Sequence, residues 1–191
     1  MDNRFLSAFT EPTRVKILGR FVYPFCLKHR VRLSAIGSPL LTGEKIEPID
    51  LLIAVQICAE EPVGKLGFVD GFRLVLLRRN ELYFTRQLKR FIDYVGVKNH
   101  PKFWERKAKE GRTETGVPWE LVVVANLMRA GVQEERAWEM PECQAIWLNT
   151  AILSSKGVDV QVLTTDEEEF MAENGKEKAE SKGESPEAQN T

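Results

Sequence analysis

Residues 48–59 read PIDLLIAVQICA, and their spacing sets the expected fold class. Apolar side chains recur there every three or four positions, which places them on one face of a helix. The following residues, EEPVG at 60–64, end the pattern, because Gly and Pro favour helix termination. We therefore expect a helix from Pro48 to Ala59 in a mainly helical protein.

Two more helical patterns flank this one. The first runs from Pro24 to Ile36, with Pro24 in the tolerated first turn, and Gly37-Ser38-Pro39 ends it. The second is a long helix from Asp70, a plausible N-cap, to Val95, with Gly96 as its stop. Its first half, FRLVLL at 72–77, is apolar enough to form a strand instead, and that alternative stays open.

The second half of the chain repeats this style of pattern. Residues 97–117 form a charged connection that is long for a compact domain. Helices are expected from Pro118 to Arg129 and from Cys143 to Lys156, with a short helical turn at Glu134–Glu139 between them. Val158–Leu163 could form a short extended segment. The expected fold is all-α, a single domain of about five to six helices over residues 4–164.

Charge separates the last residues from this body. Residues 166–191 carry nine acidic and three basic side chains, a net charge of −6, whereas residues 1–165 carry +5. Phe170 and Met171 are the only large apolar side chains of this end. We therefore predict a disordered acidic tail over residues 165–191, dispensable for folding.

Composition also limits the cellular location. No apolar run approaches the roughly 20 residues that a membrane-spanning helix needs. The first residues lack the basic-then-apolar layout of a signal peptide. Cys26, Cys58 and Cys143 are odd in number and set in apolar surroundings, which favours buried reduced thiols. We expect a cytoplasmic protein with no membrane partner.

Sequence motifs give little support for catalysis, a cofactor or a metal. Cys26 and His29 lie one helical turn apart, which is half of a metal site, but no second Cys/His pair accompanies them. A buried cysteine beside a hydrogen-bonded histidine is the favoured interpretation. The glycines show no phosphate-binding spacing, and nothing resembles a nucleophile elbow. We expect a protein that is not an enzyme and needs neither cofactor nor metal.

Two features are candidates for binding. The segment Lys98–Arg112 is basic and contains Phe103 and Trp104, so it could contact phosphates and bases, but a solvated loop is favoured and nucleic acid is an unexpected partner. Tryptophans are the second feature. Trp147 is expected in the core, whereas Trp119 and Trp138 lie at helix edges, where an aromatic side chain is either a local lid or an interface anchor.

Two stretches together resemble a known family. One runs from Leu18-Gly19-Arg20 through PFCLKH at 24–29 to Gly37-Ser38-Pro39. The other begins with Pro118-Trp119 and continues through AWEMPECQA at 137–145 to residues 157–165 and the acidic end. This pattern is similar to the tail assembly chaperones that tailed bacteriophages and prophages encode beside the tape-measure gene. The chain departs from it at Cys143 and in the long basic segment.

The resemblance implies a non-enzymatic chaperone in the bacterial cytoplasm. Its partner would be the tape-measure protein, a long apolar helical rod, with the tail tube protein as a second candidate. Grooves with aromatic and Met anchors suit such a partner, so Trp119, Trp138 and Met140 are the expected partner-binding residues. Alternatives are a structural virion component, such as a connector or baseplate subunit, and a nucleic-acid-binding regulator or packaging subunit. The oligomeric state stays open.

Overall fold

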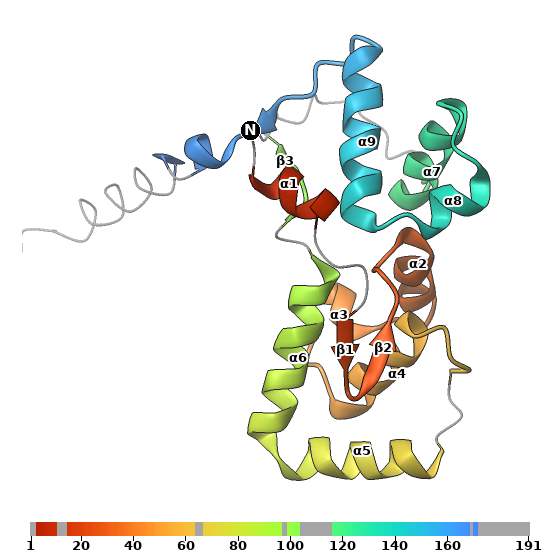
Figure 1. The fold of residues 1–191 in the computed structure, drawn as a ribbon, viewed down its shortest axis with the longest axis vertical. Coiled ribbons are helices and arrows are strands. Elements are labelled where there is room, and N and C mark those ends of the chain that lie inside the picture. The colour runs from red at the N-terminus through yellow and green to blue at the C-terminus, as the bar shows by residue number, and fades with distance from the viewer. Residues whose placement is uncertain are drawn as a thin grey trace, which may run out of the picture.

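Two clusters of buried apolar side chains organise the fold. Figure 1 shows the helices that carry them, with α7, α8 and α9 above and α4, α5 and α6 below. This computed structural model describes residues 3–10, 15–63, 67–96, 99–103, 116–168 and 170–171. Its labelled elements follow one another as α1 (Asn3–Thr10), β1 (Val15–Ile17), β2 (Arg20–Val22), α2 (Leu27–Ala35), α3 (Pro39–Thr42), α4 (Pro48–Cys58), α5 (Phe68–Arg79), α6 (Glu81–Val95), β3 (Lys102–Phe103), α7 (Trp119–Arg129), α8 (Glu134–Glu139), α9 (Glu142–Ser155) and β4 (Val162–Leu163).

The N-terminal core is built around α4. Seven of the eleven residues of this helix are buried, because it is apolar on all sides and needs cover in every direction. Strand β2 and helices α2, α5 and α6 pack against it. Figure 1 shows α4 beside the β1–β2 hairpin, with α2 above it and α5 below it. The helix expected from Pro48 to Ala59 is confirmed, ending one residue earlier at Cys58.

A hairpin that the sequence patterns do not reveal closes this core. Strands β1 and β2 are antiparallel, with Val15 opposite Val22 and Ile17 opposite Arg20. The two linking residues, Leu18 and Gly19, both have positive φ angles of 50° and 76°, as two-residue hairpin turns of the I′ type require. Leu18 is an unusual residue for that conformation. Its side chain is buried in the core, and its N–H donates to Gln87 Oε1 at 3.2 Å.

The C-terminal core lies between α7, α8 and α9. It contains Leu27, Val123, Val124, Leu127, Ala137, Met140 and Ala145. All three helices are predicted by the sequence, and their ends fall within about one residue of the predicted ones. Helix α2 joins the two cores, because Leu27 at its start packs in the C-terminal core and Leu33 near its end packs in the N-terminal core.

The expected long helix from Asp70 to Val95 is wrong, and so is the strand alternative for residues 72–77. The chain forms two helices, α5 and α6, which meet at Asn80. Asn80 leaves the helical region, with φ −126° and ψ 93°, and its side chain accepts a hydrogen bond from Tyr83 N at 2.9 Å, so it caps α6. Gly67, not Asp70, precedes α5 as its N-cap. Gly96 ends α6 as predicted, with φ 70°.

The mainly helical character is confirmed, but the all-α description is too strict. Two short antiparallel sheets are present, β1–β2 and β3–β4. The prediction of five to six helices is too low for the labelled part of the chain, because α1 and α3 carry no recognised signal and the long helix is divided.

The boundary predicted for the acidic tail also needs correction. Residues 165–168 and 170–171 are helical. Thr164 and Glu167 form reciprocal hydrogen bonds, Thr164 N to Glu167 Oε2 at 2.8 Å and Glu167 N to Thr164 Oγ1 at 3.3 Å, which is a capping box. Glu168 then pairs with Arg4 and Lys102. The helical turn therefore attaches to the body; residues 172–191 lie outside the described part.

Candidate partner-binding groove

A groove with a volume of about 650 Å³ opens between α7, α9 and the segment at 99–103. Its walls are mainly apolar, and three ionisable side chains lie at its base. The lining residues include Trp119, Val122 and Val123 of α7, Ile146 and Leu153 of α9, Phe103, Val117 and Val160, with Arg30, His100 and Glu142. We call this the α7–α9 groove.

Helix α7 forms one wall because it is apolar on more than one side. Val123, Val124 and Leu127 face the C-terminal core, while Leu121, Val122 and Met128 remain exposed. A helix of this kind has more apolar surface than its own core covers. Of these exposed residues, Val122 lines the groove and is available to a partner there.

Trp119 stands at the entrance of the groove. It is the first residue of α7, after the N-cap Pro118, and 42% of it is exposed. The Arg30 guanidinium lies 5.4 Å from the centre of its indole ring and 5.7 Å from that of Phe25. Such cation–π contacts fix the ring while leaving much of it open.

Glu142 and Arg30 form a two-point ion pair at the base of the groove. Arg30 Nε donates to Glu142 Oε2 at 2.5 Å and Arg30 Nη2 to Glu142 Oε1 at 2.7 Å. Glu142 is only 1% exposed. Burial raises the pKa of this carboxyl group, and the hydrogen bonds and charge of Arg30 oppose that shift. Both oxygens are occupied by N–H donors, an arrangement that suits positioning and not proton transfer.

His100 completes the base of the groove. Its Nε2 lies 3.5 Å from Glu142 Oε1 without a hydrogen-bond partner among the described residues. Burial and the charge of Arg30 lower the pKa of His100 to about 4, so the ring is neutral at physiological pH. The indole N–H of Trp147 donates to Asn99 O at 3.0 Å and holds the segment before His100 against α9.

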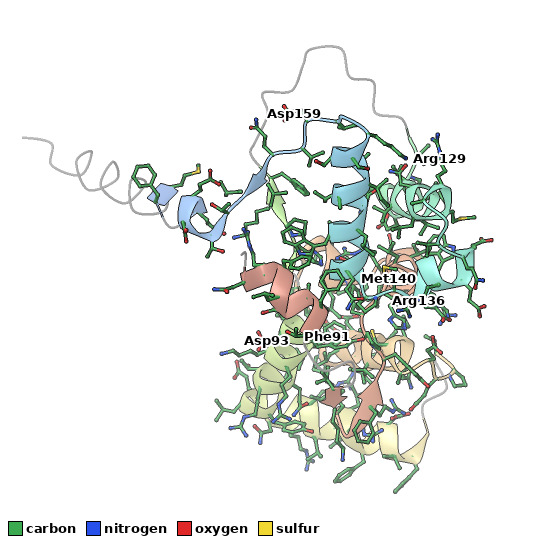
Figure 2. All side chains as sticks on the ribbon, turned by 45° about the horizontal axis from the view of Figure 1, so that its top comes forward. Phe91, Asp93, Arg129, Arg136, Met140 and Asp159 are labelled. Carbon is green, nitrogen blue, oxygen red and sulfur yellow. The ribbon has the colours of Figure 1, made fainter. Side chains whose placement is uncertain are left out.

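The three expected partner-binding residues occupy different environments. Trp119 lines the groove. Trp138, in α8, is half-buried against the C-terminal core, and Met140 is a core residue with 6% exposure. Met140 follows α8 with φ −61° and ψ 136°, and this extended turn carries its side chain inward. Figure 2 shows Met140 near the lower end of α9, among the central helices. Met140, expected to bind a partner, is therefore a buried residue of the C-terminal core.

The Cys26–His29 pair has the geometry expected of two core residues. Both side chains are buried, with Cys26 Sγ 3.3 Å from His29 Nδ1. Burial raises the pKa of the Cys26 thiol and lowers that of His29 to about 4. Within the described residues, no group of three or more His, Cys, Asp or Glu side chains has metal-site geometry.

Sequence reasoning does not find the groove base, because Arg30 and Glu142 are 112 residues apart and carry no shared local pattern. Of the basic segment Lys98–Arg112, residues 98 and 104–112, including Trp104, lie outside the described residues. In the part described, Lys102 pairs with Glu168 and Phe103 lines the groove.

Comparison with protein families, with curated proteins and with solved structures finds no match for this chain. Among the helices that the structure describes, none has the length and apolar composition to cross a membrane.

Proposed function

We propose that this chain is a non-enzymatic tail assembly chaperone, and that its α7–α9 groove binds an apolar helical segment of the tape-measure protein. The proposal combines the family resemblance of the sequence with one observation, the open apolar groove beside Trp119. Its expected setting is the cytoplasm of a bacterial host.

The shape and lining of the groove favour a side chain of a macromolecule as its occupant. The apolar walls suit the aliphatic or aromatic residues of a partner helix. Trp119 is partly exposed and already held by Arg30, so little side-chain freedom is lost on binding. These are the properties of an interface anchor.

The polar groups at the base support binding more than catalysis. Arg30 occupies both carboxylate oxygens of Glu142. The hydroxyl group in the described lining, that of Thr150, donates to Ile146 O at 2.8 Å within its own helix. Within the described lining of the groove, no hydroxyl or thiol group is hydrogen-bonded to a base that could activate it as a nucleophile.

The test is co-purification with fragments of the tape-measure protein encoded beside the gene for this chain. The fragment that co-purifies most strongly is then titrated to measure its Kd. We expect Trp119→Ala to weaken binding by about 2 kcal/mol, roughly 30-fold in Kd. Leu121→Ala is the matched control, since Leu121 is an exposed apolar residue of the same helix outside the groove lining. It should change binding little.

Trp138→Ala distinguishes the groove from an interface on α8. Loss of binding with Trp138→Ala but not with Trp119→Ala, in folded variants, would move the interface to α8. Binding that neither substitution changes, or no binding to any fragment, would contradict the proposed function.

A further inference from the structure

Helix α5 exposes an apolar face on the side turned away from the protein. Phe68 is 95% exposed and Phe72 is 61% exposed, and the same face carries Val69, Val75 and Leu76. At 100° per residue these five positions fall within about 120° of the helix circumference. We call them the α5 outer face. Figure 1 shows α5 at the end of the molecule opposite to α9.

The opposite side of α5 is firmly attached. Leu77 is buried in the N-terminal core, and Leu74 packs against it. Asp70 is buried and accepts from Arg20 at 2.8 Å and from Arg73 at 3.0 Å. Burial alone would raise the pKa of Asp70. The hydrogen bonds from Arg20 and Arg73 lower it by more, so the pKa of Asp70 lies below its usual value. The exposed face therefore belongs to a helix that is fixed in place.

Positive charge borders this face at one end. Arg78 and Arg79 are exposed at the last turn of α5. The exposed Glu81 begins α6, and Arg86, Lys89 and Arg90 are exposed farther along that helix. The acidic residue of α5, Asp70, is buried and already paired. The exposed charges of α5 are thus all positive, and those of α6 are mainly positive, with Glu81 and Asp93 as the exceptions.

We propose that the α5 outer face is a second docking surface, and that it binds an amphipathic helix of another protein whose apolar side is bordered by carboxylates. Helix α5 has twelve residues, about 18 Å of length, which matches three turns of a partner helix with apolar residues at i, i+3 or i+4, and i+7. Carboxylates of the partner would face Arg78 and Arg79. This surface is distinct from the α7–α9 groove and goes beyond the function proposed above.

Charge disfavours a second copy of this chain as the occupant. Two α5 helices in antiparallel contact would place Arg78 and Arg79 against the positive N-terminal end of the other helix. A parallel contact would bring the same arginines together. Neither arrangement supplies exposed carboxylates from α5. An acidic partner helix satisfies the arginines and the apolar face at once.

The test uses two labelled synthetic peptides of about 18 residues that share one leucine stripe. One carries Glu beside the stripe and the other carries Lys. We expect the full chain to bind the Glu peptide at least tenfold more tightly, with weakening as salt rises. Phe72→Asp should reduce binding at least tenfold, whereas Phe170→Asp, at a similarly exposed Phe (67%) beyond β4, should not.

Two further variants make the result decisive. Arg78→Glu combined with Arg79→Glu should invert the preference toward the Lys peptide. Far-ultraviolet circular dichroism of each variant establishes that it is folded. Equal binding of both peptides, or no binding of either, would overturn the proposal. So would self-association, or co-flotation with anionic phosphatidylserine vesicles, that Phe72→Asp abolishes while peptide binding is absent.

Discussion

Arg30 donates hydrogen bonds to both carboxylate oxygens of Glu142, which lies 112 residues later in the chain. The pair lies where α2 meets α9, next to the backbone hydrogen bond from Glu142 N to Phe25 O at 2.8 Å. It therefore links the helix shared by the two cores to the longest helix of the C-terminal core. The same guanidinium supports Trp119, so one side chain serves the fold and the groove.

Replacing Arg30 by Met should destabilise the protein by about 3–5 kcal/mol in urea unfolding, because it leaves a buried carboxylate without its partner. Lys28→Met is the control: Lys28 pairs with the exposed residues Glu60 and Glu139, and its loss should cost at most about 1 kcal/mol. Adding Glu142→Leu to Arg30→Met should recover much of the stability. A cost below about 1 kcal/mol for Arg30→Met would contradict the structural role of the pair.

His29 should make the protein less stable in mild acid. Burial lowers its pKa to about 4 in the folded state, whereas the unfolded chain has a histidine pKa near 6.5. Between these values the unfolded state binds the proton and the folded state does not, so stability falls as pH falls. The slope from His29 approaches about 1.4 kcal/mol per pH unit. Unfolding free energies measured from pH 7 to 4 should give a shallower slope for His29→Gln; an identical slope would show that His29 is protonated in the fold.

Asn80→Ala should lower the free energy of unfolding by about 1 kcal/mol, because it removes the side chain that caps α6. Asn80→Asp keeps an oxygen acceptor for Tyr83 N and should retain most of the stability. Thermal or urea unfolding of the two variants measures the difference. Equal losses would mean that the break between α5 and α6 does not depend on this cap.

Trp147 and Trp138 should differ in their contribution to folding. Trp147 contacts Phe5 at 5.6 Å between ring centres and donates to Asn99 O, so Trp147→Ala should cost roughly 3–5 kcal/mol. Trp138 is half-buried at the side of the C-terminal core, and its truncation should cost less. Melting temperatures of the two variants test this order. Equal losses would place Trp138 among the core residues.

Removal of residues 165–191 should lower the melting temperature by only a few degrees. This truncation breaks the ion pairs that Glu168 forms with Arg4 and Lys102, and pairs of this exposure contribute about 1 kcal/mol or less. A chain ending at Met171 keeps both pairs and should melt like the full chain. Glu168→Gln in the full chain should reproduce most of the destabilisation; a much larger fall on truncation alone would show that the helical turn itself supports the body.

Apolar spacing and helix-ending residues are sufficient to predict the main helices of the two cores. The apolar spacing of α4 predicts the position of that helix, and Gly96 predicts the end of α6. The break at Asn80 escapes prediction because the apolar pattern continues across it, and only the cap chemistry of Asn80 divides it. The Leu18–Gly19 turn escapes prediction because Leu in a left-handed conformation is stabilised by core burial, a tertiary effect.

The groove is partly readable from the sequence. Trp119 stands out because it opens a helix, and it does line the groove. Met140 precedes a proline, which suggests a surface turn, but the direction of a side chain at a turn depends on backbone angles that residue type does not specify. Arg30, His100 and Glu142 come from three separate parts of the chain, so only the folded arrangement brings them together.

Helix α1 also has a consequence for synthesis of the chain. It packs on α9, where Gln144 Nε2 donates to Ala8 O at 3.0 Å across 136 residues, and Phe5 meets Trp147 edge to face. Ribosomes add roughly 5–20 residues per second, so α1 waits on the order of ten seconds after its own synthesis until its docking surface on α9 is made. The hairpin and helices α2–α6 are complete well before that. Helix α1 is thus made before α2–α6 but is secured only after them, and the interval during which it stays exposed is set by translation speed.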